Sequence, residues 1–305
     1  MISLRDPIFG NAGQGQDDTA AIVAWLAAAD STGKKAYAPA GTYLHTGFTI
    51  PSQTTVEGES RTNTIFKLMD GANAAQSIVM DGPQIYLKNF TVECNKANNT
   101  LGNGIITTSN GSYFSGISNV NVHKCEGIAL DVILMHNGYI RDFSADRSGT
   151  GLRVKKSLSL ALDTLDLSRC IDYGLWVQGS PDPCSITASN FYLESASNPP
   201  SPNQVSAIYL EALRDIHVVD INGVFLNGHL NELVNTTGIN VHNPLSMHNV
   251  KITKILAQAV SDMLVTSNTT NSNSTLKLGD VSYHDGTVPI PPQDGVYLNW
   301  GGKCQ

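Results

Sequence analysis

The 305-residue sequence predicts an all-β fold, a parallel β-helix whose coils stack into one solenoid. From Ala36 onward, apolar and polar residues alternate in runs of three to five, separated by Asn, Gly, Ser and Asp, as in short strands. These runs recur about every 23 residues, and one segment near the N-terminus has helical spacing instead. A propeller blade needs about 40 to 45 residues, so a coil of three short strands fits the period better.

The helical segment follows Asp17 and Asp18 and ends near Gly33. Aspartate is a preferred N-cap residue and glycine suits a helix C-terminus. One face of the segment is apolar, with four residues at helical spacing: Ile22, Trp25, Leu26 and Ala29. Since a stack of coils leaves an open end, we expect this helix to cover the N-terminal end of the solenoid.

Two phrases repeat along the predicted coils. The first is a glycine followed by an apolar strand, and it begins at Gly104, Gly127, Gly151 and Gly174 and continues at Ala207 after an insertion of ten residues. The second sets a polar turn residue before a strand, at Asn89, Asn119, Asp142, Thr164, Asn190 and Asn249. Side-chain amides in register can bond to the coils above and below, so we expect these turn residues to form a ladder.

The period sets the expected organisation of the chain. We expect an N-terminal segment and capping helix over 1–35, a β-helix over 36–285 and a C-terminal tail over 286–305, where the period stops. Stacked coils share one core, so the repeat favours a single long solenoid over two separate domains.

Composition excludes several classes of protein. The chain has 26 acidic and 19 basic residues, a net charge of -7, which argues against a nucleic-acid binder with its basic stripe. No apolar run is long enough for a membrane helix, and no signal peptide follows Met1, so we expect synthesis in the cytoplasm without an export signal. Five cysteines and eight histidines show no metal-ligand spacing, so we expect free thiols, no metal and no cofactor.

Three segments resemble the opening of a known family: Gly15 to Ile22, Gly33 to Tyr43, and Val56 to Gly58. They are similar to the start of the pectate-lyase-like right-handed β-helices of bacteriophage tailspike depolymerases. The motifs cover about the first 60 residues, and the coil pattern extends the resemblance to about residue 285. The resemblance implies a right-handed β-helix, a homotrimer, a place in the phage virion tail and a bacterial polysaccharide as the partner.

Aligning the coils gives columns of outward side chains on the first predicted sheet. One column reads Ile106, Ala129, Arg153, Trp176 and Tyr209, and the next reads Thr108, Asp131, Lys155, Gln178 and Glu211. Aromatic faces stack on sugar rings, and cations pair with sugar carboxylates. The sequence therefore predicts six substrate-binding residues: Arg153, Lys155, Trp176, Tyr192, Tyr209 and Asp131. The alternative is that the aromatic residues only pack across strands or between chains.

A further outward column belongs to the second phrase. It reads Glu93, His123, Asp146, Ser168 and Glu194, beside Asn121, Ser144, Asp166, Tyr192 and Phe225. Asp166 and Glu194 would lie one coil apart, and glycosidases use two carboxyl groups about 5 to 9.5 Å apart. The alternative is a solvated face or a neutralised ladder of charges.

Four carboxylates are the candidate catalytic residues: Glu211, Glu194, Asp172 and Asp166. With them, the sequence predicts a depolymerase that hydrolyses the glycosidic bonds of a bacterial capsular or surface polysaccharide. One alternative is a lyase that acts on a uronate polymer by β-elimination, with Arg153 and Lys155 neutralising the uronate. Another is a non-catalytic carbohydrate-binding spike or adhesin.

Overall fold

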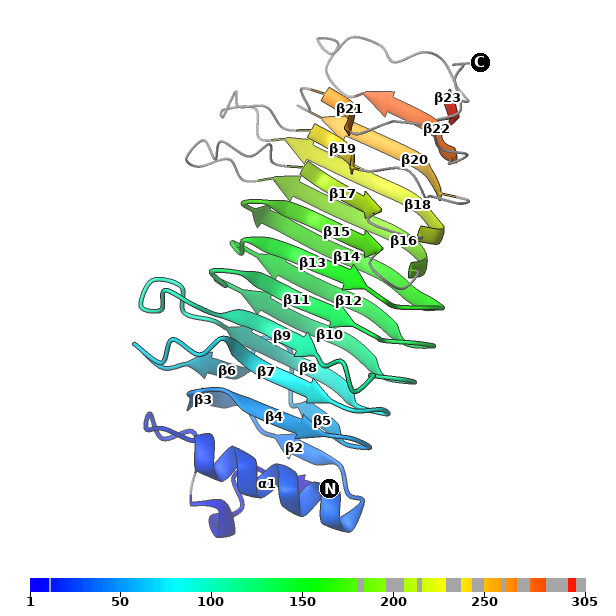
Figure 1. Ribbon diagram of the computed structural model, residues 1–305. Helices are drawn as coiled ribbons and strands as arrows, with labels where there is room; N and C mark the ends of the chain where they lie inside the picture. Colours follow the sequence, from blue (N-terminus) through cyan, green and yellow to red (C-terminus); the bar gives the residue numbers. More distant parts are fainter. Residues whose placement is uncertain are drawn as a thin grey trace. The chain divides into compact units, whose positions relative to one another are not determined.

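The computed structural model describes residues 1–10, 12–179, 184–195, 206–212, 216–228, 237–242, 250–258, 262–267, 275–283 and 296–299. Its contacts divide the chain into two compact units, Met1–Gly149 (unit 1) and Thr150–Gln305 (unit 2). Each unit is a stack of parallel strands, coil upon coil, in which a long-strand A sheet and a short-strand B sheet face each other (Figure 1). The predicted all-β parallel solenoid is confirmed.

The strands of unit 1 fall into these two sheets. The A sheet contains β1 (Ile2–Ser3), β2 (Ala36–Ala38), β3 (Gly41–His45), β5 (Thr55–Gly58), β6 (Thr64–Leu68), β8 (Tyr86–Glu93), β10 (Gly116–His123) and β12 (Tyr139–Asp146). The B sheet contains β4 (Phe48–Pro51), β7 (Gln76–Asp81), β9 (Asn103–Thr107) and β11 (Ile128–Ile133). Consecutive coils pair in parallel, as Phe90, Val120 and Phe143 do in β8, β10 and β12.

Unit 2 repeats the arrangement. Its A sheet contains β14 (Leu160–Cys170), β16 (Cys184–Ser195), β18 (Ile216–Gly228), β20 (Val250–Gln258), β22 (Thr275–Tyr283) and β23 (Val296–Asn299). Its B sheet contains β13 (Thr150–Lys155), β15 (Tyr173–Gly179), β17 (Ser206–Ala212), β19 (Thr237–His242) and β21 (Asp262–Ser267). Strand β23 lies in the predicted tail and pairs antiparallel with β22.

The predicted helix is α1 (Thr19–Thr32), which follows the short 3-10 helix η1 (Pro7–Phe9). It ends at Gly33, whose left-handed conformation (φ 62°) and backbone bonds to the last turn close the helix. The expected apolar face is buried, and Trp25 Nε1 donates to the Ile2 carbonyl oxygen at 2.9 Å. Helix α1 packs on β1, β2 and β4 and so covers the N-terminal end of unit 1 (Figure 1).

Asp18 does not cap the helix through its side chain. Its buried carboxylate accepts hydrogen bonds from the backbone N–H groups of Gly13 (3.0 Å) and Leu44 (3.2 Å) instead, and so ties the N-terminal segment to β3. Burial raises the pKa of Asp18. The neighbouring Asp17 accepts from the Thr19 backbone N–H at 2.9 Å.

The long A-sheet strands bend where one residue has a positive φ. These residues are Asn89, Asn119, Asp142, Thr164, Asn190, Gly223 and Lys254. The first five are predicted turn residues, and the Asn119 Nδ2 group donates to Asn89 Oδ1 at 2.9 Å, as a ladder requires. The sixth prediction is wrong in register: β20 pairs through Val250 with Val219, so its bend is at Lys254 and not beside Asn249, which lies outside the described residues.

Inward side chains form the core of each unit. In unit 1, the buried ring of Phe66 on β6 has its centroid 5.3 to 5.5 Å from those of Tyr43 and Phe90 on the paired strands β3 and β8 and of Phe48 on the facing B sheet. Such tilted and edge-to-face contacts stabilise a core beyond the burial of area alone. Four free cysteines are also buried: Cys94, Cys125, Cys170 and Cys184. In the described part of the chain, no helix is long and apolar enough to cross a membrane.

Candidate functional site

The outer face of the B sheet in unit 2 carries the predicted aromatic and charged columns. Strands β13, β15 and β17 pair so that one column contains Arg153, Trp176 and Tyr209 and the next contains Lys155, Gln178 and Glu211. All six side chains are partly exposed. The predicted register is confirmed here, because the glycine-anchored strands keep their inward leucine and valine residues in line.

Three aromatic rings meet on this face. Tyr173 and Tyr209 stack with centroids 4.5 Å apart and planes at 11°, and Trp176 lies 5.5 and 5.9 Å from them. The Arg153 guanidinium carbon lies 4.9 Å from the centre of the Trp176 ring, a cation–π contact. The rings therefore form one preformed aromatic cluster, which we call the aromatic platform (Tyr173, Trp176, Tyr209). Tyr173 was not among the predicted binding residues, although it begins the same strand as Trp176.

Glu211 is held against this platform. Its Oε2 atom accepts hydrogen bonds from Trp176 Nε1 at 3.1 Å and from Gln178 Nε2 at 2.9 Å. Both bonds fall on the same oxygen, so Oε1 has no hydrogen-bond partner within the described ranges. Two fixed donors orient the carboxylate, which is the arrangement that a positioned acid, base or sugar-hydroxyl acceptor needs.

The two tyrosines of the platform are protonated phenols at neutral pH. Burial, then the charges of Asp172 and Glu211, raise the pKa of Tyr173. Burial, then Glu211 and Tyr173, raise the pKa of Tyr209 strongly. The charges of both Asp172 and Glu211 act on Tyr173, and Asp172 is exposed in the turn before β15.

The other predicted site residues lie elsewhere. Asp166 and Tyr192 pair on the A sheet of unit 2, and the Asp166 carboxylate accepts a hydrogen bond from Ser168 Oγ. Glu194 pairs with Ser168 on the same sheet, and its side chain lies outside the described part. The structure thus places the predicted carboxylates in two groups, one on each sheet. The insertion of ten residues before Ala207 lies at 196–205, outside the described residues, and so do residues 180–183.

The predicted position of Asp131 is wrong. Asp131 pairs with Ile106, and not with the column of Thr108, because Leu130 is the partner of Ile105 and the two coils are 25 residues apart there rather than 23. Its side chain in unit 1 is only 1% exposed, so it is closed to a polymer on the surface. Gly127 precedes the strand, and Ile128 donates its N–H to Asn103 Oδ1 at 2.8 Å, which fixes the shifted register.

The column of Glu93, His123 and Asp146 in unit 1 has the predicted register. Glu93 forms ion pairs with Lys124 at 3.1 Å and Lys67 at 3.7 Å, and its Oε2 lies 3.8 Å from His123 Nε2. Burial lowers the pKa of His123, which favours the neutral ring. The contacts are those of a neutralised ladder, the alternative considered for this column.

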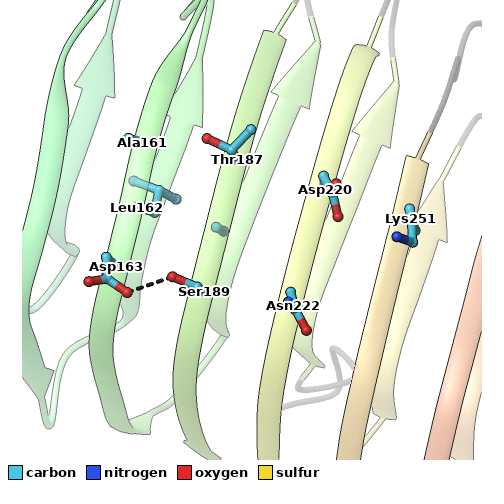
Figure 2. Close-up of a pocket in the computed structure, with 9 residues that line it drawn as sticks. Ala161, Leu162, Asp163, Thr187, Ser189, Asp220, Asn222 and Lys251 are labelled. Carbon is cyan, nitrogen blue, oxygen red and sulfur yellow. Dashed lines mark hydrogen bonds between the residues drawn. The ribbon is translucent and has the colours of Figure 1, made fainter.

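A shallow groove on the A sheet of unit 2 was not predicted. It has a volume of about 340 Å³ and is lined mainly by polar residues of four strands: Asp163, Thr187, Ser189, Asp220, Asn222 and Lys251 (Figure 2). Asp163 Oδ1 accepts from Ser189 Oγ at 2.5 Å and from Asn190 Nδ2 at 3.0 Å, and these bonds lower the pKa of Asp163. In each of the four strands, the residues that line the groove come before the left-handed bend. The repeated phrase of the sequence starts at the bend, so it does not indicate them.

Within the described residues, no three His, Cys, Asp or Glu side chains come together in a group that could hold a metal ion. The candidate site on the B sheet consists of the aromatic platform, the oriented carboxylate of Glu211 and the nearby cations Arg153 and Lys155.

The chain is similar in sequence to phage appendage proteins, and its fold is similar to that of polysaccharide-degrading enzymes. No protein-family model matches the chain. The preneck appendage protein of Bacillus phage PZA is 31% identical over 144 residues, which are 45% of this chain and 15% of that protein. The chain therefore spans a small part of this curated relative.

Two solved structures have the same fold over most of the chain. The enzymatically active domain of tailspike protein 2 from bacteriophage CBA120 aligns with a TM-score of 0.68 and 13% identity, over 92% of this chain and 42% of that one. A hyperthermoactive exopolygalacturonase from Thermotoga maritima aligns with a TM-score of 0.63 and 9% identity, over 99% and 94% of the chains. The resemblance to tailspike and pectin-degrading β-helices is confirmed at the level of the fold.

Proposed function

We propose that the chain binds a bacterial surface polysaccharide on the B sheet of unit 2 and hydrolyses its glycosidic bonds. The observation that carries the proposal is the carboxylate of Glu211, held by Trp176 and Gln178 beside three aromatic rings. A sugar has an apolar ring face, which stacks on an aromatic ring, and hydroxyl groups, which bond to carboxylate and amide groups. The aromatic platform supplies the ring faces, and Glu211 and Gln178 beside it supply the carboxylate and the amide.

In this proposal, Glu211 and Asp172 are the pair of carboxylates. Glu211 accepts two fixed hydrogen bonds, which suits the base that activates water or the nucleophile that attacks the sugar. Asp172, whose charge also acts on Tyr173, is assigned the proton transfer to the leaving oxygen. Arg153 and Lys155 bind anionic or hydroxyl groups of the chain. Asp166, Tyr192 and Glu194 on the A sheet stay predictions.

Hydrolysis is favoured over β-elimination by the state of the tyrosines. A lyase with a tyrosine base needs a phenol that loses its proton readily, whereas burial and Glu211 raise the pKa of Tyr209. Tyr173 is shifted in the same direction. Both phenols therefore serve better as hydrogen-bond donors to a sugar than as the base that removes a proton from C5 of a uronate.

The experiment is release of reducing ends from a panel of purified bacterial polysaccharides. We expect Glu211→Gln and Asp172→Asn to lower release by at least about 100-fold, since each removes a group that transfers a proton. The matched controls are Asp166→Asn and Glu194→Gln, which remove carboxylates from the A sheet of the same unit. Full activity in Glu211→Gln would contradict the assignment, and loss in the controls alone would move the site to the A sheet.

Product analysis separates the remaining alternatives. Hydrolysis gives saturated products, whereas a rise in absorbance from an unsaturated uronate would show a lyase. Tight binding without any product would show a non-catalytic adhesin. Proton NMR of the first product gives the stereochemistry, which reports whether the second carboxylate acts as a nucleophile or as a base.

We also propose that the protein acts on the phage virion as an oligomer. The similarity to a phage preneck appendage protein supports the location. A homotrimer is the state that the tailspike resemblance implies. Light scattering of the purified chain tests the trimer, and immunogold labelling of virions tests the location.

A further inference from the structure

A second ladder of left-handed residues lies in unit 1, in the turns that lead from B-sheet strands to A-sheet strands. Its residues are Gln53, Gln84, Phe114 and Asn137, with φ between 51° and 60°. Each turn is bonded to the next coil: the Gln84 N–H donates to the Tyr113 carbonyl at 2.8 Å, and the Phe114 N–H donates to the His136 carbonyl at 2.9 Å. The turns therefore stack as one rigid edge, one residue per coil.

Phe114 is the exception in this ladder. Asparagine tolerates the left-handed region, whereas a bulky aromatic residue there is strained by about 1 to 2 kcal/mol. Its ring is also 55% exposed, so burial does not offset the strain. A coil could satisfy the same backbone with less strain by using Asn, as the next coil does at Asn137. Strain without a structural gain points to a function for the side chain.

The surroundings of Phe114 match the chemistry of a sugar. Tyr113 is 37% exposed, and its ring stacks on His136 with centroids 5.1 Å apart and planes at 12°. The exposed amides of Gln84 and Asn137 occupy the ladder positions on the two neighbouring coils, about 4.8 Å to each side. The result is a narrow aromatic strip with a hydrogen-bonding amide on each flank.

We infer that the turn of Tyr113 and Phe114 is a second carbohydrate-binding site, which stacks on one sugar ring of a polysaccharide while Gln84 and Asn137 bond to its hydroxyl groups. A protein partner would need about 800 Å² on each side with a broad apolar core, whereas this strip is one ring wide and bordered by amides. None of the four residues assigned to the site is a carboxylate, and the carboxylate of Asp81 nearby in the chain accepts hydrogen bonds from Thr108 and Asn110, so we assign the site to binding and not to cleavage. Only the choice of polymer rests on the proposed function.

The decisive variant is Phe114→Asn, which gives the turn the residue of the next coil. Since Asn tolerates the native φ, we expect the variant to be as stable as the parent or more stable. We expect its affinity for the polysaccharide to fall about 3- to 10-fold, the contribution of one aromatic stack. Affinity electrophoresis in gels that contain each purified polysaccharide of the panel measures this, in a Glu211→Gln background so that the polymer stays intact.

The matched control is Leu101→Asn, which removes another exposed apolar side chain (56% exposed) from unit 1 and should leave affinity unchanged. A Phe114→Trp variant keeps a ring, and the change in its fluorescence on adding polysaccharide, beyond the change seen in the parent chain with Trp176, reports contact. Parent-like affinity in Phe114→Asn, or a Phe114→Trp emission change no larger than that of the parent at saturating polysaccharide, would overturn the inference. So would a changed oligomeric state in Phe114→Asn by light scattering, which would make the turn a contact between copies.

The two proposals fail separately. If Glu211→Gln keeps full hydrolysis while Phe114→Asn loses affinity, the catalytic assignment falls and the second site stands. If Phe114→Asn binds normally while Glu211→Gln loses hydrolysis, only the second site falls. Failure of the unmodified chain to bind any polysaccharide of the panel would overturn both.

Discussion

His45 makes the stability of unit 1 depend on pH. It ends β3, is fully buried, accepts the Gly47 N–H at Nδ1 (3.0 Å) and lies 3.4 Å from Ser77 Oγ through Nε2. Burial lowers the pKa of His45 from 6.5 to about 3. The folded chain therefore keeps a neutral ring at pH values where the unfolded chain takes up a proton.

The sign and size of the effect follow from these two pKa values. A group whose pKa is depressed by folding stabilises the protein above its unfolded pKa, and this stability is lost as the pH falls toward the folded pKa. Between pH 7 and pH 5, the loss for His45 is about 2 kcal/mol, from 1.36 kcal/mol per pH unit below 6.5. The full loss, approached near pH 3, is about 5 kcal/mol.

Urea unfolding at pH 7 and pH 5, followed by circular dichroism, measures the loss. The comparison is His45→Gln, which offers an acceptor to Gly47 and a donor to Ser77 but has no ring to protonate. Other titrating groups contribute equally to both proteins, so the difference between their pH dependences isolates His45. If both proteins lose the same free energy of unfolding between pH 7 and pH 5, the reasoning is refuted.

Three further substitutions test other contacts. Gly58→Ala should lower the free energy of unfolding by about 3 kcal/mol, because the new Cβ would lie 2.3 Å from the Asn89 carbonyl oxygen. An unchanged midpoint of thermal unfolding would contradict this close approach. Asn119→Ala should lower the free energy of unfolding, measured with urea, by about 2 kcal/mol, because alanine is strained at the left-handed φ and the side-chain bond to Asn89 is lost. Asn119→Gly loses the same bond without the strain, so it should lower the free energy of unfolding less. Trp176→Phe keeps a ring but removes one donor to Glu211, so polysaccharide hydrolysis should fall about 10-fold; parent activity would show that the bond does not position the carboxylate.

The sequence predicts those parts of the fold that repeat. The column of Arg153, Trp176 and Tyr209 was predictable because each strand follows a glycine or alanine and keeps the same inward apolar residues. Asp131 was misplaced because the coil there has two more residues than the period, and a repeat length alone does not show where an extra residue is inserted.

Features that occur in one coil only could not be predicted from the repeat. Lys254 takes a left-handed bend that Asn, Asp or Thr takes in most of the other coils, so a search for those turn residues passes over it. The stacking of Tyr173 on Tyr209 depends on the first residue of β15, which lies before the repeated phrase that begins at Gly174. Phe114 stands in a ladder that is visible only in the backbone angles, since its neighbours in the stack share no residue type with it.

The N-terminal segment also determines how the stack meets other chains. A parallel sheet with an uncovered edge offers unpaired N–H and carbonyl groups to any strand that arrives, which is a route to aggregation. In unit 1, Ile2 and Ser3 pair with β2, and α1 lies over the same end. Removing residues 1–35 would leave the edge of β2 open to a second molecule, so shortened forms of the chain should aggregate more readily than the intact chain.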